Sequence, residues 1–116
     1  MRSALKVINA LLRCTREDVL AAPLFEPVDR VPGLWVLELG PFKEDSWPGW
    51  LEEAYQTLAS NEMSLKALQE GSRDYTLHLT VAFAEGLQPV IIPPAMSHLL
   101  ASCGIALELF HRNEEA

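Results

Sequence analysis

Apolar and polar residues alternate with a period of two along residues 74–83, whose sequence is DYTLHLTVAF. A strand with one buried face produces this pattern, because successive side chains point to opposite sides of a β-sheet. We therefore predict a strand here and expect the elements that follow it to be built onto it. Its apolar side comprises Tyr75, Leu77, Leu79, Val81 and Phe83.

Residues 4–14 fit either a strand or one face of a helix, because their apolar positions recur at both spacings. The β-branched pair Val7 and Ile8 favours a strand. Thr15 is then expected to be the N-cap of a short helix, since its hydroxyl can accept a hydrogen bond from a main-chain N–H of the first turn. That helix must end before Pro23.

The middle of the chain predicts one strand and a pair of helices. Residues 34–39 are apolar on both sides, which places this strand near the middle of the sheet. The longest helical segment begins around Pro48, where a missing N–H has no intrahelical partner to lose. Its apolar stripe breaks at Ser60 and Asn61, so we expect two helices or one sharp kink, ending at Gly71.

After the central strand, residues 85–88 predict a hairpin turn and residues 90–92 a short edge strand between prolines. Pro94 opens a helix that Gly104 closes, residues 105–109 form a last strand, and residues 113–116 form a frayed acidic tail. The expected fold is α+β, with a four- to five-stranded mixed sheet, helices mainly on one face and the order β-α-β-α-α-β-β-α-β. The expected core comprises Leu37, Tyr55, Leu58, Leu68, Leu79, Val81, Leu99 and Leu107.

This order of elements resembles a bacterial domain-of-unknown-function family, some members of which lie beside toxin–immunity systems. The resemblance implies an α+β fold and, for some members, a place in such a system. It implies no catalytic residues. The matching pieces are Gly33-Leu34-Trp35, Trp50-Leu51 through Leu68, Gly71, Ile92-Pro93-Pro94 through Leu99-Leu100, Gly104-Ile105 and Leu107.

The composition of the 116 residues is that of one globular domain, with 49% hydrophobic and 22% charged residues. A net charge of −7 without any cluster of basic residues argues against nucleic acid or an anionic membrane as the partner. No apolar run approaches the roughly 20 residues that span a bilayer. Two cysteines, Cys14 and Cys103, are too few for a disulfide framework, so we expect a cytoplasmic protein with reduced thiols.

The sequence predicts no enzyme, metal or cofactor site. His78, His98 and His111 are far apart, and neither a metal-ligand spacing nor a glycine-rich phosphate loop is present. Cys103 could meet His78 or His111 in space. However, it precedes a helix-ending glycine, where the negative end of the helix dipole raises a thiol pKa.

Trp47 and Trp50, close together where a loop enters a helix, exceed what a small core requires. They are candidates for binding another protein, since tryptophan is enriched at interface hot spots. The alternative is that Trp47 is a hydrophobic staple over the helix start. We therefore expect a non-enzymatic protein-binding domain, with an immunity-type inhibitor of a basic partner as its more specific form.

A second interpretation is a small-molecule-binding or weakly catalytic domain with a pocket near His78 and Tyr75. A homodimer is also expected, because a sheet of this size leaves two edges open and the N-terminal strand offers little protection against pairing.

Overall fold

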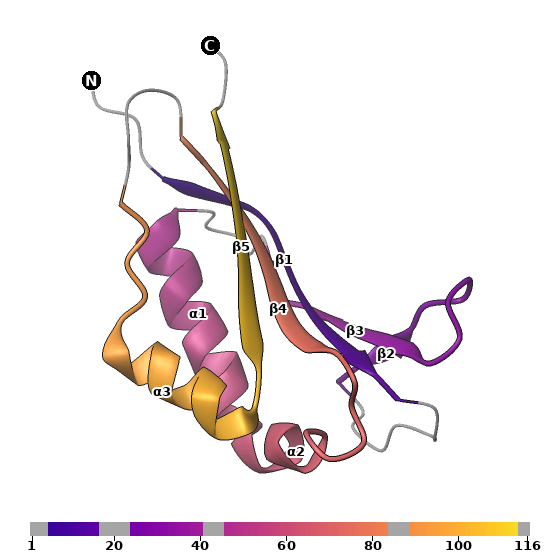
Figure 1. Cartoon of the computed structure of the whole chain (residues 1–116). Coiled ribbons are helices and arrows are strands. Elements are labelled where there is room, and N and C mark those ends of the chain that lie inside the picture. The colour runs from indigo at the N-terminus through magenta and orange to yellow at the C-terminus, as the bar shows by residue number, and fades with distance from the viewer. Residues whose placement is uncertain (1–4, 17–23, 41–45, 84–88, 114–116) are drawn as a thin grey trace.

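The computed structural model describes residues 5–16, 24–40, 46–83 and 89–113, as a twisted sheet with helices packed on one side (Figure 1). This arrangement confirms the α+β prediction. The short helix expected after Thr15 lies largely outside the described residues, and the turn expected at residues 85–88 lies wholly outside them. The elements are β1 (Lys6–Thr15), β2 (Glu26–Pro27), β3 (Leu34–Glu38), α1 (Trp47–Ser60), α2 (Glu62–Ala67), β4 (Tyr75–Phe83), α3 (Pro94–Cys103) and β5 (Ala106–Asn113).

The five strands are arranged in the order β2-β3-β1-β4-β5, with β1 at the centre. β1 pairs antiparallel with β3 on one side and with β4 on the other, and β2 pairs antiparallel with β3. Residues 4–14 were correctly expected to favour a strand. Their expected place at an open edge was wrong, because β3 and β4 occupy both sides of β1. β3 is an internal strand between β1 and the two-residue edge strand β2, in agreement with its expected place near the middle of the sheet.

β4 and β5 form the only parallel pair among the described strands, and α3 connects them. Because β1 and β5 occupy both sides of β4, no position remains beside β4 for a returning hairpin strand. The strand predicted at residues 90–92 is therefore absent, and residues 89–93 form neither helix nor strand. Asn113, expected in the tail, is the last residue of β5.

The helical predictions are confirmed at the break near Asn61 and at the end of α3, but the end expected at Gly71 was wrong, because α2 already ends at Ala67. Asn61 separates α1 from α2: its φ of −118° leaves the helical range, and its side-chain N–H donates to the carbonyl of Thr57 at 2.7 Å. α3 ends in a Schellman motif, in which the N–H of Ile105 donates to the carbonyl of Leu100 at 2.9 Å. Gly104 adopts a φ of 74° there, a conformation that other residues rarely take.

The core lies between the sheet and the three helices. β4 contributes Tyr75, Leu77, Leu79 and Val81, all buried, as its alternation predicts. Leu37 and Tyr55 are only partly buried and pack against the core. Leu107 was wrongly placed in it: it is 37% exposed, because β5 is an edge strand.

Thr15 has a role that the sequence did not predict. Its hydroxyl accepts hydrogen bonds from the main-chain N–H groups of Asp74, at 2.7 Å, and Arg73, at 3.1 Å. The Thr15 N–H donates in turn to the carbonyl of Asp74 at 2.9 Å. Thr15 therefore ends β1 and fixes the start of β4, and its hydroxyl is engaged with the neighbouring strand.

Candidate functional site

The face of the sheet that points away from α1, α2 and α3 is the candidate site, called here the open face (Figure 1). The strand registers place alternate residues of the central strands on it, and those named below are half-buried or exposed. In the part of the chain that the structure describes, no helix packs against it. Its residues include Leu11, Arg13, Thr15, Leu34, Val36, Glu38, Thr76, His78, Thr80, Ala106, Glu108 and Phe110.

Glu108 joins three strands on the open face. One of its carboxylate oxygens lies 3.2 Å from a terminal nitrogen of Arg13 and 3.1 Å from Nδ1 of His78. The same Arg13 nitrogen lies 3.8 Å from a carboxylate oxygen of Asp74. The ring of Phe110 packs against that of His78, with centroids 4.7 Å apart. These contacts hold the central part of the open face in a defined arrangement.

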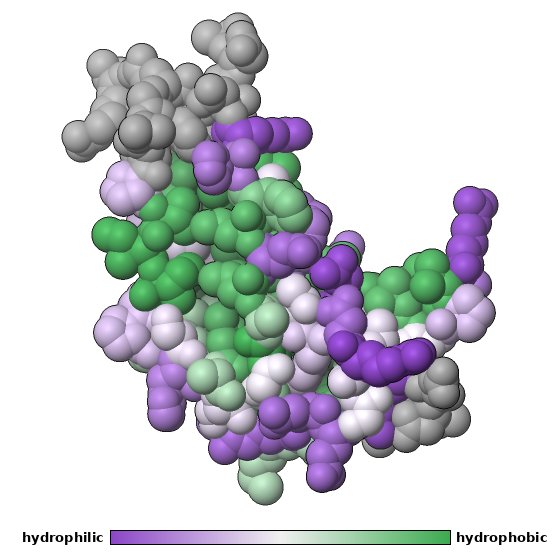
Figure 2. Space-filling model, in the orientation of Figure 1, coloured by the Kyte–Doolittle hydropathy of each residue, from purple (hydrophilic) through white to green (hydrophobic). Residues whose placement is uncertain are grey.

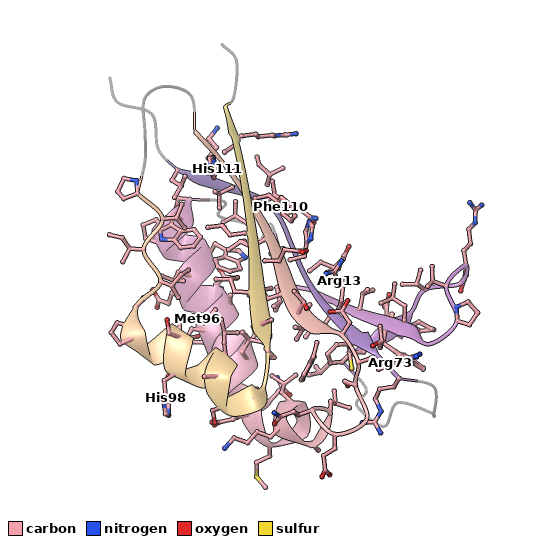
Figure 3. All side chains as sticks on the ribbon, viewed as in Figure 1. Arg13, Arg73, Met96, His98, Phe110 and His111 are labelled. Carbon is pink, nitrogen blue, oxygen red and sulfur yellow. The ribbon has the colours of Figure 1, made fainter. Side chains whose placement is uncertain are left out.

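Arg13 retains an unused donor within this group. Its Nε is buried and has no hydrogen-bond partner among the described residues. Its side chain as a whole is 30% exposed and its charge is balanced by Asp74 and Glu108. Figure 3 places Arg13 and Phe110 on the same side of the sheet, away from α1 and α3. The group thus combines balanced charges with an exposed aromatic ring.

A hollow of about 290 Å³ lies where β2 meets β3, lined by Leu24, Glu26, Val36, Leu37 and Glu38. Glu26 is directly opposite Val36, and Glu38 is two residues further along β3, so all three share the open face. Glu26 and Glu38 are exposed, whereas Leu24 and Val36 are half-buried. The hollow therefore has two carboxylates beside an aliphatic surface.

Trp47 and Trp50 lie on the other side of the sheet, within the helical layer. Trp50 is 1% exposed and its indole N–H donates to the carbonyl of Leu39. Trp47 stacks on it, with ring centroids 5.5 Å apart, and is partly buried against the core. Because its side chain is inaccessible, Trp50 is a core residue. Trp47 is the first residue of α1, directly after the N-cap Ser46, whereas a hydrophobic staple is a residue that precedes the N-cap. Its contact with Trp50 therefore lies within the first turn of the helix.

Tyr75 and His78 do not converge on one pocket. They are three residues apart on β4, and an odd separation along a strand puts two side chains on opposite faces. The Tyr75 hydroxyl donates to the carbonyl of Leu65 at 2.8 Å within the core, and burial raises its pKa. His78 lies on the open face beside Glu108. Among the described residues, Tyr75 and His78 therefore cannot line one shared pocket.

An apolar groove of about 310 Å³ lies between α1 and the start of α3. Figure 2 shows hydrophobic surface on this side of the molecule, and Ile91 nearby is 67% exposed. Nothing among the described residues indicates what would occupy the groove. Its lining residues are Pro48, Leu51, Glu52, Tyr55, Pro93, Ala95 and Met96.

The two thiols lie in the core rather than at a site. Cys14 is buried with its sulfur 3.2 Å from the Ser72 hydroxyl. Cys103 is buried at the end of α3, and burial, reinforced by Glu62 and partly offset by Lys66, raises its pKa. Such a thiol is a poor nucleophile near neutral pH.

Two further properties concern only the described residues. Within them, no three His, Cys, Asp or Glu side chains are grouped in a way that could hold a metal ion. None of their helices is long and apolar enough to cross a membrane.

Neither a scan against protein-family models nor searches of curated proteins and solved structures found a match for this chain.

Sequence reasoning missed most of the open face. Arg13 and Glu108 are 95 residues apart, and only the strand order brings them together. The acidic hollow depends equally on the pairing of Glu26 with Val36. One signal was available: the alternation in β4 already put His78 on the side opposite the core.

Proposed function

We propose that this protein is a non-enzymatic, cytoplasmic protein-binding domain that binds a basic partner protein through the open face, in the manner of an immunity-type inhibitor. The observation that carries the proposal is the one-sided cover of the sheet. All three described helices pack on one face, and the other presents half-buried aliphatic residues among charged ones. Such mixed surfaces are typical of protein interfaces.

The hollow between β2 and β3 supports a basic partner. A lysine or arginine side chain has an aliphatic stem and a charged end. The stem would lie against Leu24 and Val36, and the charged end would meet Glu26 and Glu38. The two carboxylates are exposed and therefore accessible to such a side chain.

The charge of the whole chain supports the same class of partner. The net charge is −7, and fields of this sign accelerate encounter with basic proteins. The Arg13–Glu108–His78 group beside the hollow is held by contacts of 3.2 and 3.1 Å. A surface with fixed side chains loses little conformational freedom when a partner binds.

The buried state of the thiols also favours binding over catalysis. Cys14 and Cys103 are buried, and burial raises the pKa of Cys103. Tyr75 is buried with its hydroxyl bonded to a main-chain carbonyl. These potential nucleophiles therefore have structural roles, and the accessible chemistry lies in charged and aromatic contacts on the open face.

The test is a quantitative pull-down from the cells that naturally produce the protein, followed by calorimetric titration of the purified captured protein. Three forms are compared: wild type, Glu26→Lys/Glu38→Lys on the open face, and Glu52→Lys/Glu53→Lys on α1. Each double variant adds four charges, so the net charge changes from −7 to −7 + 4 = −3 in both. This match separates a local contact from the general effect of charge.

We expect a basic protein whose affinity falls at least tenfold for the open-face variant, about 1.4 kcal/mol, and far less for the α1 variant. Equal losses would indicate that net charge alone attracts the partner. A loss confined to the α1 variant would move the site to the groove that Glu52 lines. Either result, or an acidic partner, would contradict the proposal.

A further inference from the structure

β5 is an edge strand whose protection against pairing, among the described residues, is limited to its charged side chains. Among the described strands, only β4 pairs with it, and in Figure 1 no helix or strand crosses in front of it. Its eight residues contain neither proline nor glycine, and Leu107, Leu109 and Phe110 are 37%, 37% and 45% exposed. The opposite edge, β2, has only two residues, one of which is Pro27. Long edges of the first kind are open to strand addition.

We propose that β5 pairs antiparallel with β5 of a second copy of this chain, across a two-fold axis at Phe110, giving one continuous sheet. Glu108 and Phe110 also belong to the open face, but β3, β1 and β4 separate the free edge of β5 from the hollow at β2, so self-association can be tested separately from binding at the hollow. A two-fold contact uses the same residues from both copies, and residues opposite one another must lie on the same face of the joined sheet.

The registers define which residues of β5 share a face. Glu108 and Phe110 are opposite His78 and Thr80 of β4, and Arg112 is opposite Ala82. All three therefore lie on the open face. With the axis at Phe110, the two Phe110 rings are neighbours, and Glu108 of each copy is directly opposite Arg112 of the other.

This register is the one that charge favours. It forms two opposite-charge pairs across the junction, one on each side of the aromatic pair, and such cross-strand pairs are stabilising. Moving the axis to Leu109 would place Glu108 opposite Phe110 and Arg112 opposite Ala106, and both charge pairs would be lost. The open face already holds Glu108 in position through Arg13 and His78.

Cross-linking tests the axis. Phe110→Cys places two thiols opposite one another at the axis, a distance that a disulfide can bridge. We expect mild oxidation to produce a covalent dimer from Phe110→Cys. Leu109→Cys is the matched control, since Leu109 is opposite His111 in this register. Wild type provides the background, because Cys14 and Cys103 are both buried.

Charge reversal tests the pairing. Arg112→Glu and Glu108→Arg are each expected to weaken self-association at least tenfold by opposing like charges, and a mixture of the two variants is expected to restore a heterodimer. Circular dichroism verifies that both variants fold. Sedimentation at about 100 µM should give wild type a mass of twice 12.9 kDa. A wild-type mass of 12.9 kDa, preferential cross-linking of Leu109→Cys, or no recovery on mixing folded variants would each overturn the proposal.

Discussion

The indole N–H of Trp50 donates a hydrogen bond to the main-chain carbonyl of Leu39. Leu39 follows β3, and its own N–H donates to the main-chain carbonyl of Ala10 in β1 at 2.9 Å. The bond therefore ties the first turn of α1 to the sheet at a point where both side chains are fully buried. A buried carbonyl that loses its donor costs more than the bond itself contributes.

Trp50→Phe is expected to reduce the free energy of unfolding by about 1–3 kcal/mol, since the Leu39 carbonyl loses its partner. Trp50→Ala should cost about 3–5 kcal/mol because a cavity is added. Trp47→Phe, at a half-buried ring, is the control and should cost less than about 1.5 kcal/mol. Urea unfolding followed by circular dichroism gives all three values. Equal losses at the two positions would contradict the role given to Trp50.

Leu79→Ala is expected to reduce the free energy of unfolding by about 2–5 kcal/mol, because Leu79 is 0% exposed at the centre of the apolar side of β4. Met63→Ala, at a side chain that is 86% exposed, is the control and should change it by about 0.5 kcal/mol at most. Denaturant unfolding measures both. A small loss for Leu79→Ala would show that the other face of β4 is the buried one.

Gly104→Ala is expected to destabilise the protein by about 1–2 kcal/mol, because φ is 74° there and a Cβ is disfavoured in that conformation. A Cβ would also overlap the side chain of Gln69, which is exposed and can move. The double variant Gly104→Ala/Gln69→Ala separates the two effects in thermal or urea unfolding. If removing Gln69 restored wild-type stability, steric overlap rather than backbone conformation would be the cause.

The Cys103 thiol is expected to make stability depend on alkaline pH. Burial raises its pKa above the ordinary 9.0, so the unfolded chain releases this proton at lower pH than the folded one. The stabilisation is fully present below pH 9.0 and is lost as pH rises through the folded-state pKa. As pH rises from about 7.5 to about 9.5, the free energy of unfolding of Cys103→Ala should therefore decrease less than that of wild type.

Urea unfolding at the two pH values provides that comparison. The cavity that Cys103→Ala creates lowers the free energy of unfolding equally at both pH values, so it cancels when the two values are subtracted. Labelling of native wild type with a thiol reagent should also be slow. An identical pH dependence in the variant, or rapid labelling near neutral pH, would indicate an accessible thiol with an ordinary or lowered pKa.

Local patterns predicted the elements well. Alternation identified β4, the polar break at Ser60 and Asn61 identified the division between α1 and α2, and Gly104 identified the end of α3. Each of these features depends on a few neighbouring residues, through strand periodicity, competition for main-chain hydrogen bonds or a left-handed conformation.

The arrangement of the strands could not be predicted in the same way. Nothing within residues 6–15 distinguishes a central strand from an edge strand, because the difference depends on β3 and β4. The same applies to residues 90–92, whose apolar run would suit a strand if β5 did not occupy that side of β4.

The candidate site was missed for a related reason. Trp47 and Trp50 stood out by residue type. However, the acceptor for the Trp50 indole N–H is a main-chain carbonyl, and because every residue has one, the sequence does not identify it. Arg13, Glu26, Glu38 and Glu108 looked like ordinary surface charges until strand pairing brought them onto one face.

The central place of β1 has a consequence for synthesis on the ribosome. Lys6 pairs with Ala82, and Leu11 pairs with both Glu38 and His78, so β1 is made well before β4, its more extensive neighbour. Until β4 emerges, one complete side of an apolar strand has no partner. Long-range pairings of this kind slow folding and expose nascent chains to aggregation. β1 and β4 can pair only after most of the chain has left the exit tunnel. A pause in translation before β4 would therefore prolong the time during which the unpaired side of β1 is exposed to aggregation.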